Sequence, residues 1–348
     1  MNRTTVVDGK HMRLGFTTGT CVVAAAKAAI EALESREAIH AVQVTVPAGD
    51  MLTIDVREHL RCESAATYSV IKDSGDDPDI TNGMEIFVTI TKTDTGSVVW
   101  EKGVGVGTFT EDGLMGKAGE LAVNPVPRRE IEKLLTEHMG EGIAIRIDIP
   151  EGEELAKKTF NPRLGIVGGL SILGTSGLVV PMSKSAYVAT IDLELKKLRK
   201  SGADAVILTP GNYGEERAAA LGLDGAVVKV SNYFGDALCL ARDLGFREIT
   251  LMGHVGKMAK VAIGIYQTHS AVANGRMESI AYYMAKAGAS VADMEAVEAE
   301  KTADQAIKKA AALGYDKIME AMERGIEKRV PLYLKTEDIK IRAIIYTM

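Results

Sequence analysis

Residues 161–183 read NPRLGIVGGLSILGTSGLVVPMS. The apolar run at 164–167 predicts a short buried strand, and Gly168, Gly169, Gly174 and Gly177 follow closely after it. Because glycine has no Cβ and tolerates positive φ, a turn of this kind lets the backbone approach a ligand closely. A tight turn between two packed elements would use the same residues. The stretch therefore indicates either a ligand-binding turn or a close packing contact.

Two common phosphate-binding motifs are excluded for this turn. Read from Gly169, the residues nearly match a P-loop, but Thr175 stands where the lysine would be. That lysine meets the β- and γ-phosphates, so its absence argues against a nucleotide triphosphatase. The dinucleotide pattern G-x-G-x-x-G is absent as well. A polar, glycine-rich turn remains, which suits a carboxylate, a ribose or a cofactor of modest charge.

The composition limits the classes of protein that this chain can represent. Its 348 residues predict two domains, since single cores rarely exceed about 250–300 residues. The net charge is −6 and aromatic residues make up only 5%, so nucleic acid is not an expected partner. A polyanionic substrate would need a local basic patch within this acidic chain.

The cysteines and the hydrophobic runs indicate a cytoplasmic protein. Cys21, Cys62 and Cys239 are scattered and form no C-x-x-C pair, so neither a zinc ribbon nor a disulfide framework is expected. The N-terminal residues lack the apolar stretch of a signal peptide. No apolar run reaches the roughly 18 residues of a membrane helix. The sequence does not decide the oligomeric state, and a homo-oligomer is compatible with it.

The hydrophobic periodicity divides the chain into two patterns near residue 155. Before it, five strands accompany two helices at 21–33 and 128–138, which predicts an α+β domain over 1–155. Beyond it, helices and strands alternate, which predicts an α/β domain with a small parallel sheet and a helical C-terminal part over 156–348. A final strand at 339–346 could join either sheet. The expected strands of the first domain lie at 42–46, 51–56, 64–71, 84–91 and 143–149. The first two flank the turn residues 47–50 (PAGD), which predicts a hairpin.

Polar residues follow successive strands of the second pattern. They lie at 209–212, 231–232 and 253–257, and the glycine turn after residue 167 would make a fourth strand end. Ligands of parallel sheets bind outside the carboxyl ends of the strands. These positions therefore predict a cofactor site on one edge of the sheet, although turns favour the same residue types.

Several charged residues are candidates for a catalytic or binding role. Four aspartates lie within 73–79, but the spacing of a calcium loop is missing. We expect Asp79 to lie in a solvated turn, with Asp73 and Asp76 better placed for chemistry. Arg128 is at the start of a helix, where a cation opposes the helix dipole. An anionic partner for Arg128 is therefore favoured. His254 lies on the expected edge, and no catalytic triad or metal-ligand spacing is visible.

Six strings together resemble the cobalt-precorrin-5B C1-methyltransferase family of the anaerobic cobalamin pathway. They follow one another across most of the chain: 15–29 (GFTTGTCVVAAAKAA), 69–83 (SVIKDSGDDPDITNG), 124–129 (NPVPRR), 161–183, 211–214 (GNYG) and 253–270 (GHVGKMAKVAIGIYQTHS). The chain departs from the family pattern at two places. Glu111-Asp112 stand where the family has a basic residue and a proline, and Asn274 replaces an aspartate.

The resemblance implies methyl transfer from S-adenosylmethionine to ring carbon C1 of cobalt-precorrin-5B, giving cobalt-precorrin-6A. It also implies a cytoplasmic enzyme whose first domain is similar to the second domain of ribosomal protein S5. The cobalt enters with the corrinoid substrate, so no protein metal site is expected. The alternatives are a non-catalytic tetrapyrrole-binding or carrier protein and a transferase with another donor, which cofactor binding would separate.

We assign three groups of candidate residues from chemistry and position. His254 is the first candidate for a proton acceptor, with Asp73 and Asp76 second. The macrocycle carries several carboxylates, so it should meet basic side chains. The proposed substrate contacts are Arg128, Arg163, Lys184 and Lys257, and the proposed cofactor contacts are Gly168, Gly169, Gly174, Thr175, Asn212, Ser231 and Asn232.

Overall fold

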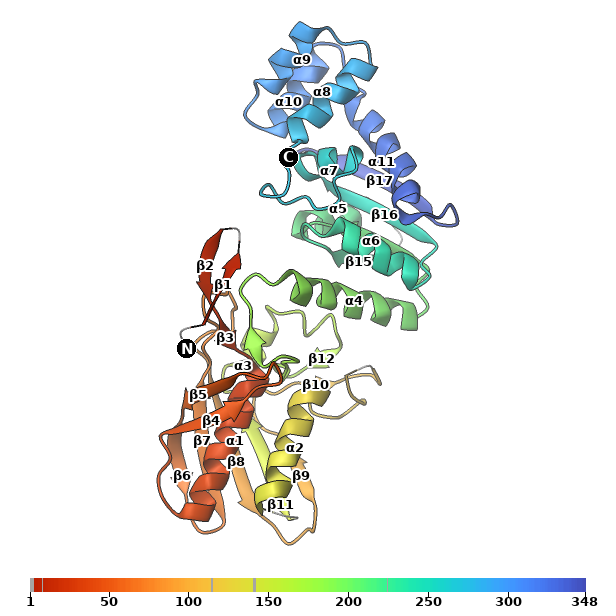
Figure 1. Cartoon of the computed structure of the whole chain (residues 1–348). Helices are drawn as coiled ribbons and strands as arrows, with labels where there is room; N and C mark the ends of the chain where they lie inside the picture. Colours follow the sequence, from red (N-terminus) through yellow and green to blue (C-terminus); the bar gives the residue numbers. More distant parts are fainter. Residues whose placement is uncertain (1–2, 8, 114, 140–141, 224) are drawn as a thin grey trace. The chain divides into compact units, whose positions relative to one another are not determined.

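A computed structural model describes residues 3–7, 9–113, 115–139, 142–223 and 225–348. The chain forms two compact units, Met1–Ser183 and Lys184–Met348 (Figure 1). The boundary expected near residue 155 is therefore wrong. Residues 161–183 belong to the first unit because their backbone is hydrogen-bonded to it: Gly107 N–H donates to Leu170 O at 2.8 Å, and Ile172 N–H donates to Ala122 O at 2.7 Å.

The first unit is built on a five-stranded sheet covered by helices α1 (Thr18–Ser35) and α2 (Pro125–Met139). α1 packs on β7 and β8 and against α2. The α+β pattern predicted for this part of the chain agrees with this arrangement. The strands, in spatial order, are β6 (Arg57–Arg61), β7 (Ala65–Ile71), β8 (Glu85–Lys92), β11 (Ile143–Asp148) and β9 (Val98–Glu101).

Small side chains let α1 lie close to this sheet. Ala24, Ala25 and Ala28 are fully buried, and the helix begins where Thr17 Oγ1 accepts the Thr20 N–H at 3.3 Å. Such a side-chain cap satisfies an amide that has no partner within the helix. The Gly19 N–H donates to Leu173 O at 2.9 Å. Ordinary capping therefore accounts for this helix start.

Short pairings complete the first unit. The hairpin predicted at 42–56 is confirmed by β4 (Ala41–Thr45) and β5 (Met51–Asp55). The strand expected at 164–167 is shorter, and it pairs antiparallel within the first unit. The other pairs are β1 (Thr4–Val7) with β2 (Lys10–Arg13), β10 (Thr108–Phe109) with β12 (Ile166–Val167), and β13 (Leu178–Val179) with β3 (Gly15–Phe16); α3 spans Gly152–Ala156.

The second unit contains the predicted parallel sheet. Its strand order is β15 (Ala226–Lys229), β14 (Ala205–Thr209), β16 (Glu248–His254) and β17 (Lys340–Tyr346), all parallel. The final strand of the chain thus joins this sheet. The helices are α4 (Lys184–Lys200), α5 (Asn212–Ala220), α6 (Phe234–Asp243), α7 (Val255–Ala262), α8 (Arg276–Lys286), α9 (Val291–Glu298), α10 (Ala303–Ala312) and α11 (Ile318–Leu334).

The strand order reverses direction between β14 and β16. From β14 the chain moves outward to β15, then crosses back to β16 on the other side of β14. Apolar residues of these strands are buried, including Leu208 and Leu251 at 0% exposure. In open parallel sheets the connections diverge at such a point and leave a crevice at the carboxyl ends of the strands. The fold therefore offers a ligand site at the carboxyl ends of β14 and β16.

Glycines bring two segments of the first unit into direct backbone contact. A Cβ on Gly105 would overlap the Ile149 carbonyl, and a Cβ on Gly169 would overlap the Gly105 backbone. The glycine-rich segment 103–107 therefore presses against neighbouring backbone. Gly169 has no positive φ, so close approach alone explains its lack of a side chain.

Gly169→Ala is expected to lower the free energy of unfolding of the first unit by about 1–3 kcal/mol, because an inserted methyl must push two backbones apart. Urea denaturation followed by circular dichroism would measure this loss. The control is Gly113→Ala, since Gly113 is exposed and a methyl group placed on it would lie 4.0 Å from its nearest neighbouring atom. Equal stability of the two variants would contradict the packing explanation.

Candidate functional site

The carboxyl edge of the parallel sheet collects three of the four predicted strand ends. Gly211 and Asn212 follow β14, Ser231 and Asn232 follow β15, and His254 ends β16. The fourth, the glycine turn after residue 167, lies in the first unit and is not part of this edge. The predicted cofactor residues are therefore divided between the two units.

The loop after β15 is held in one conformation by the segment that follows α7. The Asn232 carbonyl accepts the Thr268 N–H at 3.0 Å, and its Oδ1 accepts the Thr268 hydroxyl at 3.1 Å. Ser231 adopts a left-handed φ of 50°, which is uncommon for a residue with a side chain. Lys257 Nζ donates to the Ser231 carbonyl at 3.5 Å. The backbone of this loop is thus positioned by polar contacts.

The end of β14 leaves room for a ligand. Gly211 is extended, and a Cβ placed on it would meet no atom within 4 Å. Asn212 begins α5, and its Oδ1 accepts from Lys229 Nζ at 2.6 Å. Lys229 also pairs with Glu215 at 2.9 Å. The lysine therefore orients the start of α5 beside open space.

A surface pocket of about 280 Å³ opens between α5 and the end of β17. Its size is near the lower end for small-molecule sites, which span roughly 300–1,000 Å³. The Arg217 guanidinium lies 5.5 Å from the centre of the Tyr346 ring. Burial raises the pKa of Tyr346, so its hydroxyl stays protonated. The pocket is lined by Tyr213, Glu216, Arg217, Ala220, Tyr346, Thr347 and Met348.

His254 is oriented by a carboxylate that sequence reasoning missed. Its Nδ1 accepts the Gly256 N–H at 3.2 Å, and its Nε2 lies 2.8 Å from an oxygen of Asp304. Since Nδ1 accepts, the ring proton is assigned to Nε2, facing Asp304. Burial would raise the pKa of Asp304, but hydrogen bonds from Met348 N–H and His254 hold it low. Asp304 lies on α10, and no local pattern links it to His254.

The central glycine turn is occupied by the chain itself. A Cβ on Gly174 would overlap Thr17, and one on Gly177 would overlap Val46. These glycines and Gly169 therefore allow close packing, as expected for a tight turn between two packed elements. Gly168 borders open space and Thr175 is exposed, so only these two of the predicted cofactor residues in the first unit could reach a ligand without displacing the chain.

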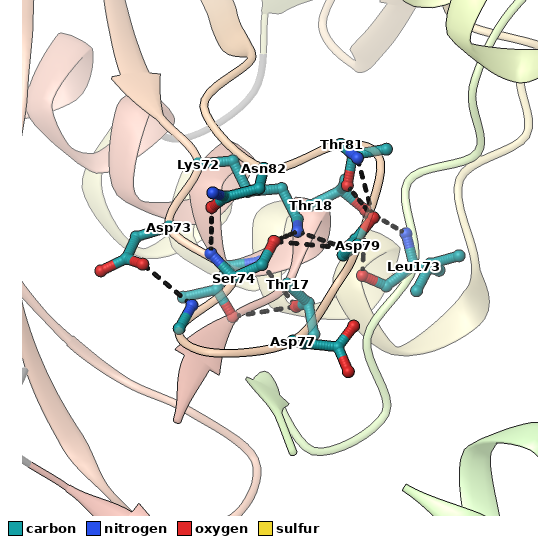
Figure 2. A network of polar contacts seen from close by, with 12 residues as sticks. Thr17, Thr18, Lys72, Asp73, Ser74, Asp77, Asp79, Thr81, Asn82 and Leu173 are labelled. Atoms are coloured by element: carbon teal, nitrogen blue, oxygen red, sulfur yellow. Dashed lines mark hydrogen bonds and ion pairs between the residues drawn. The ribbon is translucent and has the colours of Figure 1, made fainter. Parts of the chain in front are cut away.

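The aspartate-rich loop of residues 73–79 is organised by a buried ion pair (Figure 2). Lys72 is 3% exposed, and its Nζ lies 2.6 Å from Asp79 Oδ2. Asp79 Oδ1 accepts from the Thr81 N–H at 2.8 Å, and Asn82 Oδ1 accepts the Ser74 N–H at 2.8 Å. The expectation that Asp79 lies in a solvated turn is wrong, because this carboxylate neutralises the buried lysine.

Asp73 and Asp76 hold Arg13. Asp73 Oδ1 accepts from Arg13 Nη2 at 2.9 Å, and Asp76 Oδ2 accepts the Arg13 N–H at 2.6 Å. The hydrogen bond from Arg13 lowers the pKa of Asp73, although partial burial opposes this. A carboxylate with a lowered pKa is a weak proton acceptor. A structural role accounts for both residues.

The predicted substrate cations lie in different surroundings. Arg128 stacks over Trp100 at 4.9 Å and lies 3.9 Å from Glu132. Contacts within the fold therefore explain why a cation stands at this helix start. Arg163 is half-buried in the first unit. Lys184 pairs with Asp236 at 3.0 Å. Of the four, only Lys257 lies at the carboxyl edge of the parallel sheet.

These features define a two-unit α/β protein whose second unit has an open parallel sheet, a class of sheet that binds ligands at the carboxyl ends of its strands. Residues 5–181 match the model of the CbiD family, and residues 267–348 match that of the CbiD C-terminal domain. The chain belongs to the CbiD family, and the family resemblance seen in the sequence is thereby confirmed.

Two curated relatives share nearly the whole chain. The cobalt-precorrin-5B C(1)-methyltransferase of Alkaliphilus oremlandii is 42% identical, covering 99% of this chain and 96% of the relative. The enzyme of the same name from Treponema denticola is 43% identical, covering 98% and 96%. A crystal structure of cobalamin biosynthesis protein CbiD from Archaeoglobus fulgidus is 28% identical, with a TM-score of 0.42, covering 78% of this chain and 87% of that one.

Two features are absent from the described residues. They contain no helix with the length and apolar character needed to cross a bilayer. Nor do they contain a group of three or more His, Cys, Asp or Glu side chains arranged to hold a metal ion.

Lys72→Met should lower the free energy of unfolding by up to about 3–5 kcal/mol at pH 7, because the half-buried carboxylate of Asp79 would lose its counter-charge. Burial raises the pKa of Asp79, but the hydrogen bond and charge of Lys72 outweigh it, so its pKa is lowered from the ordinary 3.8. The contribution of the pair is therefore present above pH 3.8 and lost as the pH falls through the lower folded-state pKa.

Urea titrations at pH 7 and near pH 3 would test this, with the difference between wild type and Lys72→Met expected to shrink in acid. Arg146→Met is the control, since Arg146 and Asp148 form an exposed pair of the same unit. Exposed pairs contribute little to stability. A Lys72→Met variant as stable as this control would contradict the buried-pair interpretation.

Proposed function

We propose that this chain transfers a methyl group from S-adenosylmethionine to ring carbon C1 of cobalt-precorrin-5B, giving cobalt-precorrin-6A. The main support is that relatives 42% and 43% identical, matched over 96% of their own length, carry this one name. Both units of the chain take part in these matches. The relatives' names favour a transferase over a tetrapyrrole carrier.

The chain's own packing supports one set of residues as contacts for the methyl donor. The space beside Gly169 and Gly174 is filled by neighbouring backbone and by Thr17, so a cofactor does not fit there. The sheet edge does suit it, since Gly211 borders open space. We therefore propose that Asn212, Ser231 and Asn232 bind its polar groups and that Glu216, in the adjacent pocket, offsets its positive charge.

When bound, S-adenosylmethionine supplies an electrophilic methyl group on a sulfonium. The residues of the sheet edge must hold donor and acceptor carbon in line and exclude water, and such positioning supplies much of the rate of a bimolecular reaction. The loop around Ser231 and Asn232 is suited to this because Thr268 fixes its backbone.

We propose His254 as the proton acceptor if the acceptor carbon must lose a proton. Asp304 faces Nε2, which leaves the lone pair on Nδ1. To accept a proton, Nδ1 must release the Gly256 N–H, a bond of 3.2 Å. Asp304 then stabilises the positive imidazolium that forms.

We also propose a fold relationship for the first unit and a cellular location for the protein. The similarity of the first unit to the second domain of ribosomal protein S5 is compatible with its five-stranded sheet and two covering helices. The free thiols of Cys21, Cys62 and Cys239 support a reducing compartment, and we propose the cytoplasm.

Gly211→Val is expected to weaken binding of S-adenosylhomocysteine by about tenfold or more, because the added side chain would fill open space at the end of β14 without clashing with the fold. Isothermal titration calorimetry on wild type and variant would measure this. Gly113→Val, the same change at an exposed loop glycine of the first unit, should bind like wild type.

Two outcomes would contradict the proposal at different levels. Unchanged binding to Gly211→Val would keep the methyltransferase and move the donor away from this edge. A wild-type protein that binds no S-adenosylhomocysteine, alone or with corrinoid present, would favour the carrier.

His254→Ala is expected to lower turnover by about 10²–10⁴-fold while S-adenosylhomocysteine still binds, which is the usual contribution of a general base. Asp304→Asn should give a smaller loss, since the amide keeps the contact but not the charge. His11→Ala, at an exposed histidine of the first unit, serves as the control. Unchanged turnover in His254→Ala would remove the role.

A further inference from the structure

Three cations of the second unit lie near one another without a carboxylate. Lys257 and Lys260 are one turn apart on α7, and Arg276 opens α8. Lys260 is 4% exposed, and its Nζ donates to the Thr268 carbonyl at 2.8 Å. The Nε of Arg276 is buried and has no hydrogen-bond partner. Within the described part of the chain, no ion pair joins any of these three to Asp or Glu.

These three residues, called here the basic cluster, repel one another. Burial lowers the pKa of Lys257, and the charge of Lys260 lowers it further. Burial likewise lowers the pKa of Lys260, and the charge of Arg276 adds to this. Arg276 also stands at the start of a helix, where a cation faces the positive end of the dipole. Each contact therefore costs stability in the folded chain.

A second buried lysine shows how this fold neutralises charge elsewhere. Lys72 and Lys260 are the lysines buried among the described residues, at 3% and 4% exposure. Lys72 has Asp79 at 2.6 Å, whereas Lys260 has a neutral carbonyl. An uncompensated buried charge is strongly unfavourable. The missing negative charge of the basic cluster is thus best supplied by a ligand.

We propose that the basic cluster binds a side-chain carboxylate of the macrocyclic substrate; the identity of this ligand rests on the proposed function. Lys257 and Arg276 are only half-buried, and residues 270–272 between them are exposed, so an anion from solvent can reach the cluster. A carboxylate would accept charge-assisted hydrogen bonds from the half-buried side chains of Lys257 and Arg276, and the buried charge of Lys260 would add to the attraction.

The charge of the cluster distinguishes the substrate from the methyl donor. S-adenosylmethionine has one carboxylate but carries a net positive charge through its sulfonium and ammonium groups, so three uncompensated cations repel it overall. The corrinoid substrate carries several carboxylates. Lys257 also contacts the loop at the end of β15 through Ser231, so a carboxylate held here lies next to the proposed donor site.

Uroporphyrin, a tetrapyrrole with eight carboxylates, is a suitable probe. Its binding, followed by fluorescence, is expected to be about tenfold or more weaker for Arg276→Met and for Lys257→Met, since each removes a charged hydrogen bond. Arg276→Lys should recover part of the affinity. Binding of S-adenosylhomocysteine to Arg276→Met should change less than about twofold, since Arg276 lies outside the proposed donor contacts.

Lys308→Met removes an exposed lysine of α10 in the same unit and is the matched control for net charge. The thermal unfolding midpoint of Arg276→Met should equal or exceed that of wild type, because the buried Nε–H of the arginine has no partner to lose. A role limited to structure would instead lower this midpoint and leave uroporphyrin binding as it was.

The outcomes separate this inference from the proposed function. Unchanged uroporphyrin affinity in Arg276→Met and Lys257→Met, or loss of S-adenosylhomocysteine affinity alone, would overturn it. Wild-type protein that binds S-adenosylhomocysteine but not uroporphyrin would also overturn it and leave the methyltransferase standing. Uroporphyrin binding that depends on Arg276 in a protein that never binds S-adenosylhomocysteine would support the inference and favour the carrier.

Discussion

The contact between the backbones of Gly105 and Gly169 organises the first unit. It requires two segments without side chains to lie against each other, far apart in sequence, and it brings residues 161–183 into the unit that ends at Ser183. The neighbouring glycines, Gly174 and Gly177, accept Thr17 and Val46 in the same way. A stretch that resembles a ligand-binding turn is therefore largely filled by the protein itself.

In the second unit, by contrast, the parallel sheet leaves space at its carboxyl edge. A reversal of strand order between β14 and β16 opens that edge, and polar contacts from Thr268 and Lys229 hold the loops around it. His254 lies at the same edge, and its Nε2 contacts the carboxylate of Asp304. The division of roles follows from this: the first unit is closed by glycine packing, and the second offers groups that a ligand can meet.

The treatment of buried charge differs between the two units. In the first, Lys72 and Asp79 neutralise each other inside a network of hydroxyl and amide groups (Figure 2), which stabilises a loop. In the second, Lys260 lies beside Lys257 and Arg276, and no carboxylate of the residues that the structure describes forms an ion pair with it. Since both lysines are equally hidden from water, the contrast fits a structural role for the first and supports the binding role proposed for the second.

The sequence by itself determined the family, the hairpin at 42–56 and the parallel α/β pattern, because long strings and local periodicity carry that information. Only the tertiary structure decided the unit boundary, the pairing of Asp79 with buried Lys72, the pairing of His254 with Asp304 and the neutral partner of Lys260. These depend on which segments meet across the chain, and neither spacing nor composition records such contacts. A glycine that makes room for a ligand and one that makes room for a backbone are identical in sequence, and only the neighbour that occupies the space tells them apart.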